Sequence, residues 1–138
     1  MSGPRRVLQD FYDRFGEGDL EGAVAMFADS IRITDPGLGT AEGREQIRRY
    51  LCGLKEAVPD ATAIVERGFE VGDTAIVEGR FTGTAATAPS QPDGQPISAA
   101  GQIDLPFADF AVIRDGRIGE YRTYYDQVSL LTQLGEMT

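Results

Sequence analysis

The chain has 138 residues, and its 13 Lys and Arg against 22 Asp and Glu give a formal net charge of −9 at pH 7. Histidine is absent and Cys52 is the only cysteine, which excludes Ser-His-Asp and Cys-His catalysis, His-ligated metals and an internal disulfide. Acid–base chemistry would therefore come from carboxylates, Tyr, Lys55 or water.

The length fits a single domain, residues 1–138, and is sufficient for a hydrophobic core. With 41% apolar and 25% charged residues, the composition is that of an ordinary soluble protein. The basic residues are scattered, so we expect neither nucleic acid nor a membrane as a partner. No apolar run reaches the roughly 18 to 20 residues of a membrane span, and the first ten residues lack the apolar stretch of a signal peptide, so we expect a cytoplasmic protein.

No sequence pattern indicates a cofactor. The phosphate-loop pattern GxxxxGK[ST] is absent, and the glycine-rich stretch 37–43, GLGTAEG, does not follow the dinucleotide-binding pattern. We therefore expect no cofactor and no metal.

Hydrophobic periodicity predicts three helices in the first half of the chain. They cover residues 6–16, about 20–28, and 43–57. Asp19 can cap the second helix, and Pro59 stops the third. The second helix would place three apolar residues on one side: Leu20, Val24 and Phe27. A strand over 30–35 precedes the third helix and ends at a Pro36-Gly37 turn.

The second half of the chain is predicted to be mostly strands. They cover residues 61–71, 74–84, 99–113 and 117–125. Gly72-Asp73 and Asp115-Gly116 form the hairpin turns, residues 85–98 form a long loop, and Pro106 allows a bulge. A short helix closes the chain. This order of elements predicts an α+β fold with helices packed on one face of an antiparallel sheet.

Asp109 is a charged residue in an apolar row. The odd positions of the strand over 99–113 share one face: Ile103, Leu105, Phe107, Asp109, Ala111 and Ile113. A buried carboxyl group has a raised pKa and becomes a candidate proton donor at pH 7. The alternative interpretation is an Asp at a sheet edge or one paired with Arg80 or Arg122.

Asp35 and Asp126 are further candidate catalytic carboxylates, and each also has a structural explanation. Asp35 ends the first strand, where Asp favours the first position of a β-turn. Asp126 follows the last strand and could cap the C-terminal helix, or it could lie at a cavity mouth beside Tyr124. Neither face of the strand over 117–125 is cleanly apolar, so alternation does not identify its inner face.

Tyr12 and Tyr50 lie on apolar helix faces, where Tyr is a core residue more often than a catalytic acid. They are nonetheless candidates for substrate binding. The other candidate substrate-binding residues are Phe15, Phe107, Arg122 and Tyr124.

The stretches GEGDLEGAVAMFADSIRITDPGLG and GREQIRRYL resemble the start of the NTF2-like superfamily. The end, IRDGRIGEYRTYYDQVSLLTQLG, resembles the SnoaL-like polyketide cyclase branch of that superfamily. The resemblance implies a curved antiparallel sheet wrapped by three N-terminal helices. It also implies a homodimer paired through the outer face of the sheet.

Three subfamilies imply different roles for the same residues. In SnoaL-like cyclases the Asp that matches Asp126 is the acid/base of an intramolecular aldol closure. In ketosteroid isomerases the Asp that matches Asp35 is the general base, and the one that matches Asp109 stays protonated at neutral pH and stabilises an oxyanion. Limonene epoxide hydrolases share a last strand like Tyr124-Tyr125-Asp126.

These observations favour a cofactor-independent enzyme that carries out proton-transfer chemistry, cyclisation or isomerisation, on a small apolar carbonyl or polyketide-like compound. One alternative is a non-catalytic, dimeric protein that binds a small apolar molecule. It is favoured by Ala85, which stands where cyclases often carry a His. An epoxide hydrolase is the third possibility.

Overall fold

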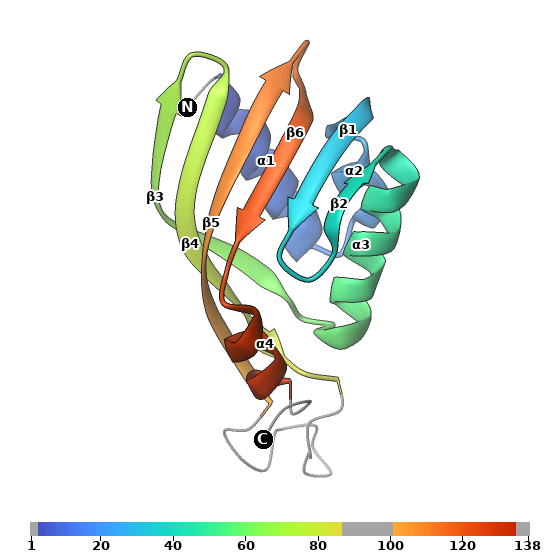
Figure 1. Ribbon diagram of the computed structural model, residues 1–138, viewed down its shortest axis with the longest axis vertical. Coiled ribbons are helices and arrows are strands. Elements are labelled where there is room, and N and C mark those ends of the chain that lie inside the picture. The colour runs from blue at the N-terminus through green and yellow to red at the C-terminus, as the bar shows by residue number, and fades with distance from the viewer. Residues whose placement is uncertain (1–2, 87–100, 135–138) are drawn as a thin grey trace.

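The computed structural model describes residues 3–86 and 101–134. Its elements, in chain order, are α1 (Pro4–Gly16), α2 (Leu20–Val24), β1 (Phe27–Asp35), β2 (Gly39–Glu42), α3 (Arg44–Ala57), β3 (Thr62–Val71), β4 (Thr74–Thr84), β5 (Gln102–Arg114), β6 (Arg117–Tyr124) and α4 (Gln127–Gln133). The predicted α+β class is confirmed, and Figure 1 shows α1, α2 and α3 packed against a single curved sheet.

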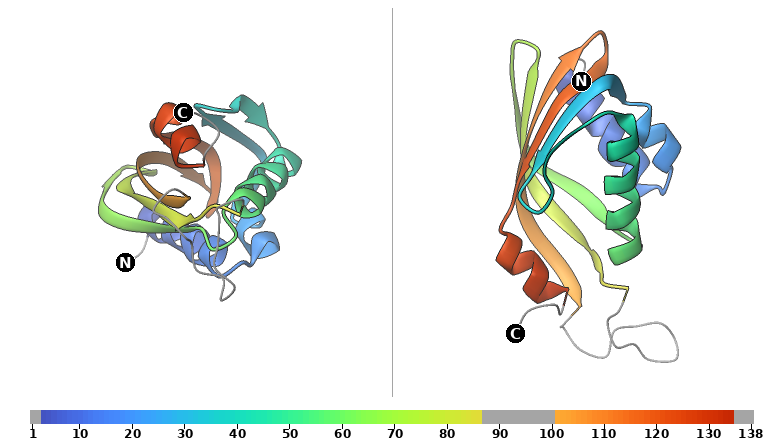
Figure 2. Two further views of the ribbon diagram at one scale, coloured as in Figure 1. Left: turned by 90° about the horizontal axis from the view of Figure 1, so that it is seen from below. Right: turned by 45° about the vertical axis from the view of Figure 1, so that its right-hand side comes forward.

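The sheet has six strands in the order β2-β1-β6-β5-β4-β3. Four of the five pairings are antiparallel, as predicted, but β1 and β6 run parallel. The chain leaves β1 through β2 and α3, crosses to the far edge at β3, and returns by hairpins, so β6 arrives beside β1 in the same direction. Figure 2 shows the sheet curving toward the side on which α1, α2 and α3 lie.

The hydrophobic core lies between the sheet, α1 and α3. Leu8 and Phe11 from α1 and Ile47 and Leu51 from α3 are almost fully buried there. The alternation predicted for β5 is confirmed, because Ile103, Leu105, Asp109 and Ala111 are buried while the residues between them are more exposed.

Two expectations about local structure were wrong, and one strand was missed. The second helix ends at Val24, and Phe27 begins β1, where it is buried against α1. No bulge occurs at Pro106, which pairs in unbroken register with Arg80. Strand β5 pairs with β6 only from Ala108 onward. No hydrogen bond between these two strands therefore needs the backbone N–H that Pro106 lacks. Strand β2 was not predicted.

The Asp115-Gly116 turn is confirmed. Both residues have positive φ angles, 52° and 76°, as the favoured two-residue hairpin turn requires. The predicted loop over 85–98 lies almost entirely outside the described residues. No helix that the structure describes is long and apolar enough to cross a membrane.

Candidate functional site

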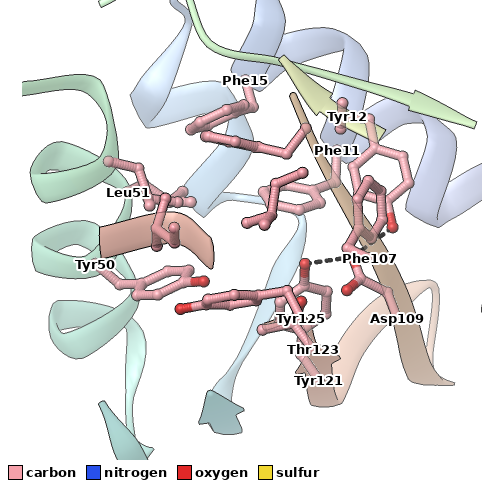
Figure 3. A pocket seen from close by; sticks show the side chains of 15 residues that line it. Phe11, Tyr12, Phe15, Tyr50, Leu51, Phe107, Asp109, Tyr121, Thr123 and Tyr125 are labelled. Carbon is pink, nitrogen blue, oxygen red and sulfur yellow. Dashed lines mark hydrogen bonds between the residues drawn. The ribbon is translucent and has the colours of Figure 1, made fainter. Parts of the chain in front are cut away.

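A pocket opens between α1, α3 and the inner face of the sheet (Figure 3), with about 580 Å³ of space between its atoms, including its open mouth. Eight of its 15 lining residues are aromatic, and most of the others are aliphatic. Asp109 is the only charged residue among them. The lining residues are Phe11, Tyr12, Phe15, Tyr50, Leu51, Leu54, Ala63, Phe81, Leu105, Phe107, Asp109, Tyr121, Thr123, Tyr125 and Leu130.

Asp109 reaches the pocket from the inner face of β5 and is only 1% exposed. The hydroxyl groups of Tyr12 and Tyr121 both donate to its Oδ2, each at 2.6 Å. Its Oδ1 is buried and has no hydrogen-bond partner among the described residues. This carboxyl group therefore has one oxygen that accepts two hydrogen bonds and one that accepts none among the described residues, with the side chain of Thr123 opposite it on β6.

The pKa of Asp109 is raised to about 6. Burial is the main cause, and the nearby carboxyl group of Asp35 adds to it. The side chains of Thr123, Tyr12 and Tyr121 act in the opposite direction because they stabilise the ionised form. At neutral pH Asp109 is therefore mainly a carboxylate, close to the pH at which it takes up a proton.

Asp35 is the last residue of β1 and is also buried. Its Oδ1 accepts hydrogen bonds from the backbone N–H groups of Gly37 (2.7 Å) and Leu38 (3.0 Å), which confirms the β-turn interpretation. Tyr50 donates to Oδ2 at 2.7 Å, and the hydroxyl of Tyr125 lies 3.0 Å from both oxygens. Asp35 thus lies behind two pocket tyrosines and does not line the pocket itself.

Four of the five tyrosines of the chain therefore donate to a buried carboxyl group. In the view of Figure 3 the hydroxyl groups of Tyr50 and Tyr125 lie on one side of the pocket and Asp109 on the other. The pKa of each of the four tyrosines is raised, chiefly by burial and then by the neighbouring carboxyl group. They stay protonated at neutral pH and act as hydrogen-bond donors.

Besides Asp35, three predicted site residues do not line the pocket. Asp126 is exposed and caps α4, accepting hydrogen bonds from the N–H groups of Val128 (3.0 Å) and Ser129 (3.2 Å). Arg122 is exposed and pairs with Glu120 at 3.0 Å. Tyr124 also points away from the pocket and packs edge-on against Phe110 on the outer face.

These residues at the end of the chain point away from the pocket because of the orientation of β6. Its inner face carries Tyr121 and Thr123, and Tyr125 just beyond the strand continues it, whereas Arg122 and Tyr124 face outward. Five residues predicted from the sequence do line the pocket: Tyr12, Phe15, Tyr50, Phe107 and Asp109. The aromatic lining residues that were not predicted are Phe11, Phe81, Tyr121 and Tyr125. Phe11 shares the apolar face of the predicted first helix, so its period could have indicated it.

No metal site emerges from residues 3–86 and 101–134, which hold no cluster of three or more His, Cys, Asp or Glu side chains. Within the described ranges, the only polar side chains that line the pocket are those of Asp109, Thr123 and the four tyrosines. The arrangement as it stands offers one available carboxylate oxygen and several hydroxyl donors inside an apolar enclosure.

Comparison with known proteins relates the chain to one family. A family model described as a SnoaL-like domain matches residues 8–121. A search of curated proteins finds no match.

Many solved structures share the fold. IdmH from Streptomyces antibioticus, described as a candidate polyketide cyclase, is 25% identical, with a TM-score of 0.78 over 97% of this chain and 99% of that one. A candidate polyketide cyclase from Bacillus cereus is 23% identical, with a TM-score of 0.75 over 96% of this chain and 80% of that one. A protein of ketosteroid isomerase-like fold from Catenulispora acidiphila, in complex with trimethylamine, is 20% identical, with a TM-score of 0.79 over 97% and 95%.

Proposed function

Since the chain belongs to the SnoaL-like domain family, we propose that it catalyses proton-transfer chemistry, a cyclisation or an isomerisation, on a small and mostly apolar carbonyl compound of the polyketide type. The observation that carries this proposal is the Oδ1 atom of Asp109, which is buried and unpartnered among the described residues in a pocket of aromatic side chains. A general base works best when its pKa is near the working pH, and that of Asp109 is about 6.

Asp109 serves as the base and then as the acid. Its Oδ1 takes a proton from the carbon next to the substrate carbonyl, and the electron pair of that C–H bond forms an enolate. In an isomerisation the proton returns to another carbon of the enolate. In a ring closure the enolate carbon bonds to a second carbonyl carbon, and the oxygen of that carbonyl receives the proton. Both sequences balance without a cofactor.

Tyr125 is the best placed donor for the enolate oxygen. It lines the pocket, and its hydroxyl shares two contacts of 3.0 Å with Asp35, longer than the 2.6–2.7 Å of the other three tyrosine–carboxyl bonds. Asp35 keeps two backbone donors and Tyr50 when Tyr125 turns away. An O–H donor aimed at a developing oxyanion stabilises the transition state. In this proposal Asp35 positions the tyrosines, and Asp126 has no part in the reaction.

The direct test is Asp109→Asn assayed against a panel of polyketide-like ketones in D₂O, with NMR detection of deuterium next to the carbonyl. Loss of a general base lowers such rates by roughly 10²- to 10⁴-fold. The matched control is Asp126→Asn, the same substitution at an exposed helix cap, and it should stay within about twofold of the wild type, because Asn caps a helix as well as Asp does. Equal exchange rates in the wild type and Asp109→Asn would contradict the proposal.

The pH profile is a second readout of the same proposal. The base form of Asp109 is the ionised one, so the exchange rate should rise as the pH increases through about 6 and then level off. A rate that is flat between pH 5 and pH 7 would mean that another group takes the proton.

A second candidate function is binding of a small molecule without turnover. It is supported by the aromatic lining of the pocket and by the Catenulispora acidiphila neighbour, which holds trimethylamine. Native mass spectrometry of the freshly purified protein distinguishes the two functions. A retained ligand together with no exchange of any tested ketone would favour binding.

A further inference from the structure

The pocket gathers acidic groups that no basic side chain of the described residues offsets. Asp109 lines it, Asp35 lies directly behind two of its tyrosines, and none of its lining residues is Lys or Arg. The ion pairs between described residues involve at least one partly exposed partner each, and none of them includes Asp35 or Asp109. A buried carboxylate without a counter-ion attracts a cation or takes up a proton.

The aromatic lining favours the same kind of ligand. The faces of aromatic rings carry partial negative charge and attract cations within about 6 Å of the ring centre. One lining ring already contacts a cation that lies outside the pocket, since the ammonium group of Lys55 is 4.5 Å from the centre of the Phe15 ring. Lys55 does not line the pocket and donates instead to the carbonyl of Ala61.

The available oxygen of Asp109 adds a requirement for a hydrogen-bond donor. Both tyrosine bonds go to Oδ2, so Oδ1 stays buried without a partner among the described residues. A ketone or an ether has only acceptors and does not satisfy an ionised Oδ1, whereas a protonated amine brings both a charge and an N–H.

We propose that the pocket binds a small protonated alkylamine, with its N–H directed at Oδ1 of Asp109 and its alkyl groups packed against the surrounding rings. This inference rests on the second function proposed above, retention of a small molecule, and adds the chemical class and the contact atom. Because the amine engages the oxygen that proton transfer needs, it also excludes a ketone substrate from the same place.

Three probes of similar size separate charge from shape. Trimethylammonium has a charge and an N–H, tetramethylammonium has a charge alone, and tert-butyl alcohol is uncharged. Their dissociation constants are measured at pH 7.5 by titration of backbone amide chemical shifts. We expect trimethylammonium to bind at least tenfold more tightly than tert-butyl alcohol, with tetramethylammonium between them. Equal affinity for the three probes, or binding of none of them, would overturn the proposal.

Asp109→Asn removes the charge with little change of shape and should reduce trimethylammonium binding to the level of tert-butyl alcohol. Asp126→Asn removes one charge from the exposed end of α4 and should leave the affinity unchanged. Equal losses in the two variants would mean that the cation responds only to the overall negative charge. The three-probe comparison needs only the wild-type protein, so it decides the question even if Asp109→Asn fails to fold.

The pH dependence adds a readout that a surface site would not give. The polar groups around Asp109 are Tyr12 from α1, Tyr50 from α3, Tyr121 and Thr123 from β6, and Asp35 from β1, while its partner on β4 is the apolar Val77. The tyrosines stay protonated, so Asp109 governs the response. Affinity for trimethylammonium should fall as the pH is lowered through about 6.

The outcomes also separate this inference from the catalytic proposal. Amine binding is measured without a substrate, and ketone exchange is measured without an amine. Exchange that depends on Asp109 together with no amine binding would overturn only the inference. Amine binding without any exchange would overturn only the catalytic proposal.

Discussion

Asp109 and Asp35 are both buried and are both bonded by two tyrosines, yet their remaining capacity differs. Asp35 also accepts two backbone N–H groups, so both of its oxygens are engaged. Asp109 has no backbone donor and keeps one oxygen unpartnered among the described residues. The difference arises because Asp35 ends a strand at a turn, where amides are free, whereas the amides around Asp109 are committed to the sheet.

The raised pKa of Asp109 predicts how stability depends on pH. Its pKa in the folded state, about 6, lies above the ordinary 3.8, so the folded protein holds this proton more tightly than the unfolded chain does. Ionisation of Asp109 therefore lowers the free energy of unfolding as the pH rises from about 4 to about 6, by roughly 3 kcal/mol in total, with no further change above.

Asp109→Asn cannot ionise and should lack this dependence. Urea unfolding at pH 4 and at pH 7 should show the wild type losing about 2–3 kcal/mol relative to Asp109→Asn between the two pH values. Asp126→Asn is the control for the substitution itself. Parallel stability curves for the wild type and Asp109→Asn would contradict the prediction.

Alternation identified Asp109 because β5 has one clearly apolar face. The same reasoning could not choose a face for β6, since its inner face carries the hydroxyl groups of Tyr121 and Thr123, and that of Tyr121 donates to the buried Asp109. Arg122 and Tyr124 were proposed for the pocket, and Tyr121 and Tyr125 were overlooked, for this reason. Asp126 was proposed because it follows the last strand and matches the acid/base Asp of SnoaL-like cyclases. Alternation reveals the inner face of a strand only where that face is apolar, and the inner face of β6 carries polar side chains.

At the scale of elements, α4 forms part of the pocket wall through Leu130 but has no fully buried residue. Asp126 caps its first turn, and Gln133 exchanges two hydrogen bonds with the backbone of Asp104 on β5. The helix is therefore held mainly by polar contacts at its two ends.

Asp126→Ala should loosen α4, because loss of a helix cap costs about 1 kcal/mol. We expect the amides of residues 128–134 to exchange with deuterium about fivefold faster, with the sheet amides unaffected. Asp126→Asn retains the capping oxygen and should exchange like the wild type. Unchanged exchange in Asp126→Ala would show that Gln133 and Leu130 hold the helix without the cap.

Gly79 in β4 lies where the backbone of the neighbouring strand β3 comes very close. A Cβ at this position would collide with the backbone oxygen of Ile64 and press on the ring of Phe107, beside the bulge of β3 between Val65 and Arg67. Gly79→Ala should reduce the free energy of unfolding by about 1–3 kcal/mol.

The matched control for this prediction lies on α3. Gly53 is exposed in the middle of the helix, with open space where a Cβ would lie. Gly53→Ala should raise the free energy of unfolding by roughly 0.5–1 kcal/mol, since Ala is the better helix former. Chemical denaturation measures both variants, and a tolerated Gly79→Ala would mean that β3 can shift.

Long elements were predicted well and short ones poorly. The hairpins of β3–β4 and β5–β6 were placed within a few residues because their turns and alternation agree. Strand β2 was not predicted because it has only four residues and none of them is buried. The second helix was drawn too long because Phe27 fits a helical period, although it packs into the sheet one element later.

At the scale of the whole molecule, the outer face of the sheet is apolar at several positions. Phe69, Ile76, Phe110 and Arg122 are successive partners across β3, β4, β5 and β6, and directly opposed partners share a face. The exposed large apolar residues on this face are Ile64, Phe69, Val71, Phe110 and Tyr124. We propose that a second copy of the chain covers it.

Light scattering at micromolar concentration should therefore give twice the mass of one chain. Phe110→Glu places a negative charge in the middle of this face in both copies and should yield a monomer. Leu38→Glu makes the same kind of change at an exposed residue of the turn between β1 and β2 and should leave the dimer intact. A monomeric wild type would contradict the proposal.

The family could be recognised from the sequence because the residues that carry the resemblance lie at turns and strand ends. The backbone geometry at these positions allows few residue types. The family model confirms that resemblance. The resemblance could not say which carboxyl group lines the pocket, because proteins that share a fold can carry different sites.

The placement of the tyrosines also gives the protein an intrinsic spectroscopic signal that comes mainly from the pocket. The chain has five tyrosines and no tryptophan, so its near-ultraviolet absorbance and its intrinsic fluorescence come chiefly from tyrosine. Four of the five lie in the pocket with their hydroxyl groups on Asp35 or Asp109. Tyr124→Phe removes the fifth, and the remaining spectrum would then report events inside the pocket without any label.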